Sequence, residues 1–375
     1  MVRVIEIGHI VAGPTAGLIL ADLGHDVIKI EKPGEGDISR RLTGTSTGSF
    51  RFFNRNKRSL TLNFNSDEGR EIFLKLIVES DVLIDNLGSG ALKRSGLSYE
   101  ILSKINPGLI YLSLKGYGKG PYEDRKSLDY PIEVHTGLAY MTGLENQPLR
   151  VGTSIVDITS AMFGVIGILS ALYERDTSGK GKYIDIGMFE TSAFLIGQHI
   201  VTYQINHKPI KPINVEGFSW AIYDFFKTRD AKDIFIGVTT DNQWVKFCEG
   251  LKLGVCDDPK FEKNEDRYAK RPELLKIIEK RISEIDYADL EKLLSELNVA
   301  YSVLNTPWDL LNDIHLKPKM AEENFEGGKI FMPTIPNGSA FHKEPPELGE
   351  DDEEILRELG YSDEKIENLK NNKII

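Results

Sequence analysis

The chain has 375 residues, 41% of them hydrophobic and 27% charged, which is typical of a soluble globular protein with room for two domains. Its 46 Lys and Arg against 57 Asp and Glu give a net charge of −11, which argues against a general nucleic-acid-binding protein. The only cysteines, Cys248 and Cys256, signal no disulfide framework, and the seven histidines show no metal-ligand spacing, so we expect no metal site.

The first half of the chain predicts alternating strands and helices. Strands are expected over 2–7, 27–30, 60–64, 82–85 and 109–114, and helices over 15–23, 67–79 and 99–105. Pro14 suits the first turn of the first helix, and Gly24 suits the position after its end. Repeated strand–helix–strand units build parallel sheets, so this half is predicted to be α/β and doubly wound.

The second half predicts a smaller α+β region. Strands are expected over 220–228 and 233–238, and helices over 243–251, 272–282, 287–297, 351–359 and from Ser362 onward. The predicted organisation is a large domain over 1–200, a linker over 201–219 and a small domain over 220–306. A second linker over 307–333 then leads to a segment, 334–375, that returns to the large domain.

Two features at the expected strand ends suggest a ligand site. The first strand–helix turn has Gly8, Gly13 and Gly17, which is not the spacing of a dinucleotide fingerprint and favours a plain structural turn. Glycine-rich loops over 85–90 and 115–121 follow two further strands, where α/β sheets bind ligands.

A basic stretch lies between these features. It places seven Lys and Arg residues between Lys32 and Arg58 in an otherwise acidic chain. Clustered cations of this kind suit a polyphosphate ligand, and they equally suit a surface loop with ion pairs. Both interpretations stay open from the residues alone.

Asp157 is the most informative single residue. The next charged residue after it is Glu174, and the apolar run 158–173 is shorter than the roughly 20 residues of a membrane span, so we expect a buried helix in a cytoplasmic protein. An isolated aspartate before such a helix is either an N-cap or a nucleophilic carboxylate that the helix N-terminus keeps ionised.

Ordered sequence blocks along nearly the whole chain carry a resemblance to a known family. The blocks lie at 12–14, 20–24, 27–31, 36–40, 54–59, 91–97, 106–111, 116–121, 168–181 and 348–350. Together they resemble the class III CoA-transferases, a family that includes formyl-CoA and carnitine CoA-transferases and the α-methylacyl-CoA racemases. The resemblance implies a Rossmann-like large domain, a small α+β domain and a homodimer of two interlocked chains.

The resemblance also implies the site. Coenzyme A or acyl-CoA is expected as a substrate beside a carboxylic acid, with no permanently bound cofactor, no nucleic acid and no membrane. Asp157 matches the catalytic aspartate, which in transferases forms a covalent intermediate. The positions that match CoA-contacting residues are His9, Val11, Ala12, Lys32, Leu62, Asn63, Phe64, Asn65, Asn86, Leu87, Gly88, Arg94, Lys115, Gly116, Tyr117 and Gly118.

The racemase branch of the family is the alternative, in which the aspartate transfers a proton at the α-carbon. Its His-Asp pair reads Leu128-Asp129 here, His135 is off-register, and the segment 237–244 lacks the expected glutamate. Leucine carries no proton, so the sequence favours a CoA-transferase. Many transferases have Gln-Ala where this chain has Glu133-Val134, which leaves the acyl groups open. A non-catalytic CoA- or dinucleotide-binding protein is a further alternative.

Overall fold

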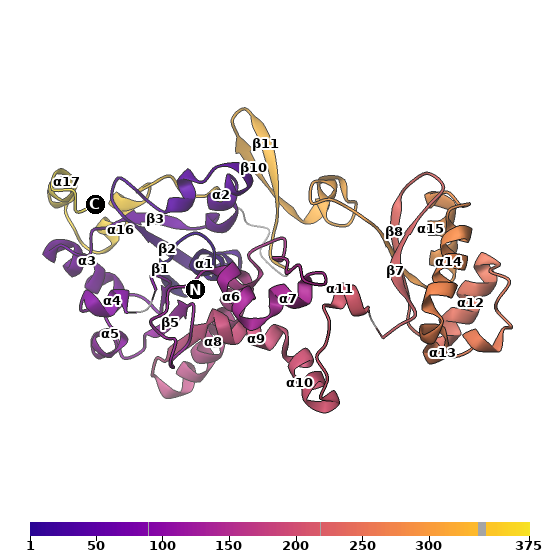
Figure 1. Cartoon of the computed structure of the whole chain (residues 1–375). Helices are drawn as coiled ribbons and strands as arrows, with labels where there is room; N and C mark the ends of the chain where they lie inside the picture. The colour runs from indigo at the N-terminus through magenta and orange to yellow at the C-terminus, as the bar shows by residue number, and fades with distance from the viewer. Residues whose placement is uncertain (89, 218, 337–342) are drawn as a thin grey trace. The chain divides into compact units, whose positions relative to one another are not determined.

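The computed structural model describes residues 1–88, 90–217, 219–336 and 343–375. The chain divides into two compact units. The first comprises Met1–Pro212 with Lys319–Ile375, and the second comprises Ile213–Pro318 (Figure 1).

A six-stranded parallel sheet forms the centre of the first unit. Its strands are β1 (Arg3–Ile7), β2 (Asp26–Glu31), β3 (Arg58–Thr61), β4 (Val82–Asp85), β5 (Ile110–Lys115) and β6 (Tyr183–Gly187). Their order is β3-β2-β1-β4-β5-β6, so the direction of winding reverses between β1 and β4. Sheets of this kind bind ligands outside the carboxyl ends of the strands at that reversal. The predicted α/β fold with a parallel sheet is confirmed.

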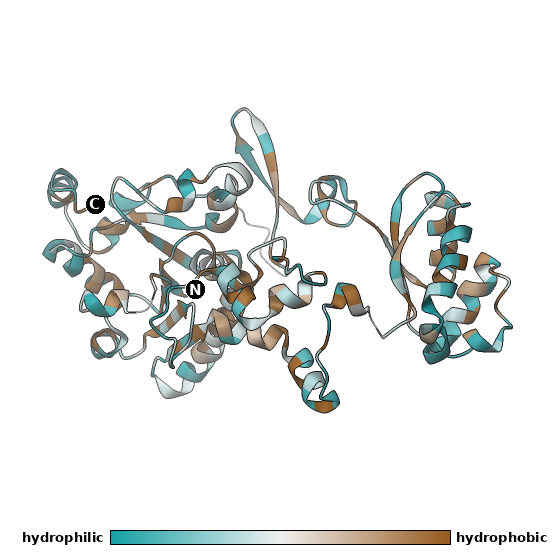
Figure 2. Cartoon of the chain, viewed as in Figure 1, coloured by the Kyte–Doolittle hydropathy of each residue, from teal (hydrophilic) through white to brown (hydrophobic). Residues whose placement is uncertain are grey.

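Helices cover both faces of this sheet. One face packs against α3 (Asp67–Val78), α5 (Tyr99–Ile105), α16 (Asp352–Glu358) and α17 (Asp363–Asn371). The other packs against α1 (Ala12–Asp22) and α8 (Ile155–Ser178). Figure 2 shows hydrophobic colours along the sheet strands. A Cβ at Gly164 would lie 2.7 Å from Leu112, so the glycine lets α8 approach β5 closely.

Helix α8 is longer than the sequence indicated. It has 24 residues, so the length argument against a membrane span was wrong: by length and composition α8 is the one candidate span among the described residues. Core helices of soluble proteins pass the same test. Ala161, Val165 and Ile168 of α8 are buried against the sheet and α1.

Some of the remaining α-helices and strands of the first unit lie within the two segments predicted as linkers. The remaining α-helices and strands are α2 (Ser49–Asn54), α4 (Ala91–Arg94), α6 (Asp129–Thr136), α7 (Leu138–Thr142), α9 (Met188–Leu195), α10 (Gly197–Asn206), β10 (Met320–Phe325) and β11 (Gly328–Pro333). The segment 201–219 starts inside α10, and 307–333 contains the β10–β11 hairpin. Many side chains of this hairpin are polar and exposed, so it lacks the apolar alternation from which strands are recognised.

The second unit has an antiparallel sheet in the order β7-β8-β9. Its elements are α11 (Ile213–Glu216), β7 (Ile222–Lys227), β8 (Asp233–Val238), α12 (Asp241–Leu251), α13 (Asn264–Ala269), α14 (Arg271–Ile282), α15 (Tyr287–Glu296) and β9 (Ala300–Val303). Trp244, Phe247 and Ile278 lie in its core. Cys248 and Cys256 form a disulfide, which the cysteine count did not predict.

Candidate active site

The topology brings the starts of α1 and α8 to one edge of the sheet. A helix that connects neighbouring parallel strands runs back across the sheet and therefore begins near the carboxyl edge. Helix α1 connects β1 to β2, while α8 precedes β6, packs on β5 and β6 and contacts α1. Val11 and Ala12, at the start of α1, therefore share this edge with Asp157, in the first turn of α8.

The turn between β1 and α1 is tight and strained. A Cβ on Gly8 would lie 2.9 Å from the Cα of Gly13, so the turn closes only around glycine. Ile10 has a φ of 62°, a left-handed conformation that costs a β-branched residue about 1–2 kcal/mol. Its backbone N–H points to the carboxylate of Asp37, at 3.4 Å. Strain of this kind persists only where surrounding contacts enforce it, and it concentrates at functional sites.

A buried ion network holds this turn. Lys29 Nζ lies 2.9 Å from Glu6 Oε1, 3.0 Å from the Gly8 carbonyl and 2.9 Å from Asp37 Oδ2. Lys57 Nζ donates to Glu6 Oε2 at 2.5 Å. All four charged side chains are buried, and the Coulomb attraction of the carboxylates raises the pKa of Lys29 despite the burial that opposes it. The network therefore holds the turn in place through the Gly8 carbonyl and the Ile10 N–H.

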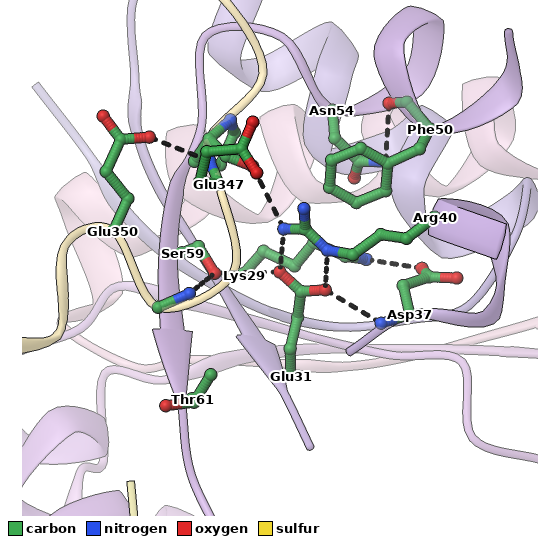
Figure 3. Close-up of polar contacts among 12 residues, drawn as sticks. Lys29, Glu31, Asp37, Arg40, Phe50, Asn54, Ser59, Thr61, Glu347 and Glu350 are labelled. Atoms are coloured by element: carbon green, nitrogen blue, oxygen red, sulfur yellow. Dashed lines mark hydrogen bonds and ion pairs between the residues drawn. The ribbon is translucent and has the colours of Figure 1, made fainter. Parts of the chain in front are cut away.

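Most of the predicted basic stretch forms ion pairs within the protein. Arg40 donates two hydrogen bonds to Glu31, from Nε to Oε2 at 2.7 Å and from Nη2 to Oε1 at 2.6 Å (Figure 3). Its Cζ atom lies 3.7 Å from the centroid of the Phe50 ring. Arg55 pairs with Asp22 at 2.6 Å in the interior. Both residues form the ion pairs of the second interpretation, with Arg55 buried and Arg40 partly exposed. Their charges are already matched within the protein, which argues against a polyphosphate site on these two residues.

A cavity of 360 Å³ gathers seven of the predicted CoA-contacting residues. These are His9, Lys32, Leu62, Asn63, Phe64, Asn65 and Leu87, which follow the ends of β1, β2, β3 and β4. Lys32 is exposed and pairs with Glu35 at 2.5 Å. A surface pair of this kind is weak, so an anionic ligand can replace Glu35 as the partner of Lys32.

Other predicted residues lie outside this cavity. Asn86 accepts a hydrogen bond from the N–H of Gly13 at 3.1 Å and donates to the Leu114 carbonyl at 3.0 Å, so it braces the turn. Gly88 and Lys115 line a separate cavity of 660 Å³, where Lys115 pairs with Glu123 and Asp185. Arg94 ends α4 and is outside the residues that line these two cavities.

The loop 116–118 adjoins the start of α8. Tyr117 is buried in a cluster with Ile132 of α6, Val156 of α8 and Met188 of α9. The N–H of Gly118 donates to Glu190 Oε2 of α9 at 3.1 Å. Because Val156 immediately precedes Asp157, this cluster connects the predicted loop with the predicted catalytic carboxylate.

Asp157 is not the N-cap of its helix. Ser154 occupies the N-cap position, and Asp157 lies in the first turn, three residues further on. Asp129 Oδ2 takes the capping role from α6, accepting the N–H groups of Val156 at 2.9 Å and Asp157 at 3.1 Å. The Asp157 carboxylate is therefore not needed as the cap, which leaves it available for chemistry.

Burial raises the pKa of Asp157 to about 7, with the negative charge of Asp129 as the second cause and Arg150 opposing both. Burial therefore opposes the ionisation that the helix N-terminus was expected to favour. A carboxylate with this pKa is a better nucleophile than an ordinary aspartate and is still substantially ionised at neutral pH.

A cluster of charged residues surrounds Asp157 and was not predicted from the sequence. Arg150 Nη2 lies 3.3 Å from Asp129 Oδ1, and Glu133 lies one turn after Asp129 on the same face of α6. The i, i+4 spacing of these two acids was the available signal. Leu128 is exposed, and His135 Nδ1 pairs with Tyr117 Oη at 3.0 Å.

The sequence matches the family model described as CoA-transferase family III over residues 1–352. The chain belongs to CoA-transferase family III. It is 33% identical to succinyl-CoA:glutarate CoA-transferase of Mus musculus, over 98% of this chain and 88% of the mouse protein. It is 32% identical to the succinyl-CoA–L-malate CoA-transferase alpha subunit of Chloroflexus aurantiacus, over 100% of this chain and 92% of that protein.

A solved structure of a CAIB/BAIF family protein from Brucella suis has the same fold. Its TM-score is 0.82 and its identity 32%, over 96% of this chain and 98% of the Brucella chain. The predicted family is confirmed, and the chain is an enzyme of the family III CoA-transferase class, whose members use acyl-CoA as a substrate.

Proposed function

We propose that this enzyme moves CoA from an acyl-CoA to a carboxylic acid through a covalent intermediate on Asp157. One observation carries the proposal. The Asp157 carboxylate lies at the carboxyl edge of the sheet, released from capping by Asp129 and with a pKa near 7. Such a group is poised to attack a thioester carbonyl.

The 360 Å³ cavity is the proposed entry for the CoA moiety. It combines apolar surface from Leu62, Phe64 and Leu87 with amide groups and the exposed ammonium of Lys32. This mixture suits a ligand with an aromatic base, a flexible amide arm and phosphates. The cavity and the start of α1 lie at the edge where Asp157 also lies, so the thioester end of the arm would extend toward Asp157.

The proposed reaction has two symmetric halves. Asp157 attacks the acyl carbonyl, the C–S bond breaks, CoA leaves as the thiolate, and a mixed anhydride of Asp157 and the acyl group remains. The thiolate attacks the Asp157 carbonyl of that anhydride and releases the donor acid, which leaves an aspartyl-CoA thioester. The acceptor carboxylate then attacks this thioester and expels the CoA thiolate, which gives an anhydride of Asp157 and the acceptor. The thiolate attacks the acceptor carbonyl of that anhydride, and Asp157 leaves as the free carboxylate.

The proposed acceptor is a short dicarboxylic acid. The relatives named above are transferases for glutarate and for L-malate, and both are named for succinyl-CoA as well. A panel of short dicarboxylates and monocarboxylates with succinyl-CoA as donor tests this choice. Higher kcat/KM for a monocarboxylate than for every dicarboxylate would refute it.

We also propose that the working form is a homodimer. Helix α8 exposes Met162, Ile166 and Tyr173, and α10 exposes Val201 and Ile205. Exposed apolar side chains in this density mark a surface that another chain covers. Light scattering at micromolar concentration should give twice the mass of the chain, whereas a monomer would contradict the proposal. The cytoplasmic location stays a prediction.

Isotope transfer tests the mechanism. With an acceptor acid labelled in its carboxylate by a heavy oxygen isotope, a reverse half-reaction at Asp157 leaves one labelled oxygen on the Asp157 side chain. Direct attack of the acceptor on the donor thioester would label the released donor acid and leave Asp157 unlabelled. Peptide mass spectrometry after a single turnover separates these routes. Asp157→Asn should abolish transfer, and Asp176→Asn, exposed at the other end of α8, should not.

A further inference from the structure

A buried acid pair on α6 adjoins the first turn of α8. Asp129 and Glu133 are spaced one helical turn apart and are 5% and 0% exposed. Asp129 accepts the two amide groups of the α8 first turn and a guanidinium N–H of Arg150. Glu133 Oε2 accepts the N–H of Val151 at 3.0 Å. Each acid therefore has backbone partners near Asp157.

The second oxygen of Glu133 has no such partner. Glu133 Oε1 is buried, and no donor among the described residues forms a hydrogen bond with it. The nearest cation is Arg150 Nε at 3.9 Å, and that guanidinium is 47% exposed and already bonded to Asp129. Buried polar atoms are otherwise nearly always paired. An ionised Glu133 would leave this oxygen unpaired and put a second negative charge beside Asp129.

A proton on Glu133 resolves both problems. The protonated oxygen becomes a donor, and Asp129 is the acceptor within reach of Glu133. One proton then serves two carboxyl groups, as in other buried acid pairs. Asp129 is the acceptor of the pair because it already accepts the α8 amides and faces Arg150.

We propose that Glu133 is a positioning residue that holds a proton shared with Asp129, so that a single negative charge braces the α8 first turn beneath Asp157. This inference rests on the proposed role of Asp157 as nucleophile.

The charges around Glu133 agree with this assignment. Burial is the largest cause that raises the pKa of Glu133 to about 7; the hydrogen bond and the negative charge of Asp129 add to it, while the Val151 N–H and Arg150 oppose it. Asp157 faces the pair from α8. On α9, Glu190 turns its carboxylate to the loop 116–118, and α7 carries no charged side chain.

Loss of this proton should impair the enzyme. When Glu133 ionises, two adjacent negative charges repel each other and compete for Arg150 and for the amides of the α8 first turn. The wild-type profile of kcat/KM against pH should therefore be bell-shaped, rising as Asp157 ionises and falling as the acid pair loses its proton. The two limbs belong to the cluster as a whole because the groups interact.

Glu133→Gln is the informative variant. Its amide oxygen can still accept the Val151 N–H, and its amide group can donate to Asp129 permanently, so folding is preserved. We expect the acid limb to remain and the alkaline fall to disappear. The control is Glu145→Gln, at an exposed site between α7 and α8, and this variant should keep the bell-shaped profile. An alkaline fall that persists unchanged in Glu133→Gln would overturn the positioning role.

A second measurement does not depend on CoA transfer. In an Asp157→Asn background, which removes the signal of Asp157 itself, the infrared carbonyl band of a buried protonated carboxyl should be present at pH 6. The band should be lost when Glu133→Gln is added and kept when Glu145→Gln is added. Because Asp85 and Asp352 are further buried acids with raised pKa values, the reading is the difference between the two spectra. Identical carbonyl regions with and without Glu133→Gln would overturn the shared proton. If transfer itself proves absent, this measurement still decides the inference.

Discussion

Replacing Asp157 by asparagine should make the protein more stable at neutral pH. The side chain is partly buried beside Asp129, and burial raises its pKa from 3.8 to about 7. Raising the pKa of an acid above its unfolded value means that the folded state disfavours the charge. The resulting cost is absent below pH 4, grows between pH 4 and 7, and is complete above pH 7. Asparagine keeps the shape and removes the charge.

The magnitude follows from the pKa. A rise from 3.8 to about 7 corresponds, at about 1.4 kcal/mol per pH unit, to about 4 kcal/mol at pH 8. The carboxylate is partly open to solvent, and screening reduces the expected gain to about 2 kcal/mol. That gain should raise the Tm of the first unit by about 5 °C.

Scanning calorimetry of wild type and Asp157→Asn at pH 8, 6 and 4, at matched concentration, measures this difference. The gain should shrink steadily with falling pH and vanish near pH 4. Asp176→Asn, exposed in the last turns of the same helix, should change stability by less than about 0.5 kcal/mol at every pH. A loss of stability in Asp157→Asn at pH 8, or a gain independent of pH, would refute the electrostatic reasoning.

Three further substitutions test other parts of the site. Glu6→Gln leaves Lys29 and Lys57 buried without a full counter-charge, so it should lower the free energy of unfolding, measured in urea, by about 3–5 kcal/mol. A decrease below about 1 kcal/mol would contradict the stabilising role of the ion network. Lys32→Ala should raise the KM for acyl-CoA about 10-fold with an unchanged Tm, and an unchanged KM would remove Lys32 from the CoA site. Gly8→Ala should cost about 1–3 kcal/mol because a methyl group meets the start of α1.

Much of the fold follows from local sequence patterns. Strands β4 and β8 have the predicted bounds because short apolar runs between polar residues specify them. Helix α5 also has the predicted bounds, because Asn106, Pro107 and Gly108 follow its last residue. The edge strand β6 was not predicted. Its sequence contains Tyr183 and Asp185, which line a polar cavity, so the strand does not read as an apolar run.

Asp157 and the CoA-contacting residues were predicted through family blocks, which record what local pattern does not. The structure gathers seven of them in the 360 Å³ cavity, and their roles stay predictions. The roles of Arg40 and Arg55 were not predictable, because their partners Glu31 and Asp22 come from other elements and meet them only in the folded chain. The pKa of Asp157 likewise depends on burial that no short sequence window contains.

In the proposed mechanism, Asp157 carries CoA as a thioester during turnover. The most direct measurement is to mix the enzyme with succinyl-CoA, trap the reaction with hydroxylamine and identify modified peptides by mass spectrometry. A covalent intermediate on Asp157 should give a hydroxamate at Asp157 that requires the acyl-CoA and is missing in Asp157→Asn. An unmodified Asp157 peptide from enzyme that is turning over would contradict it.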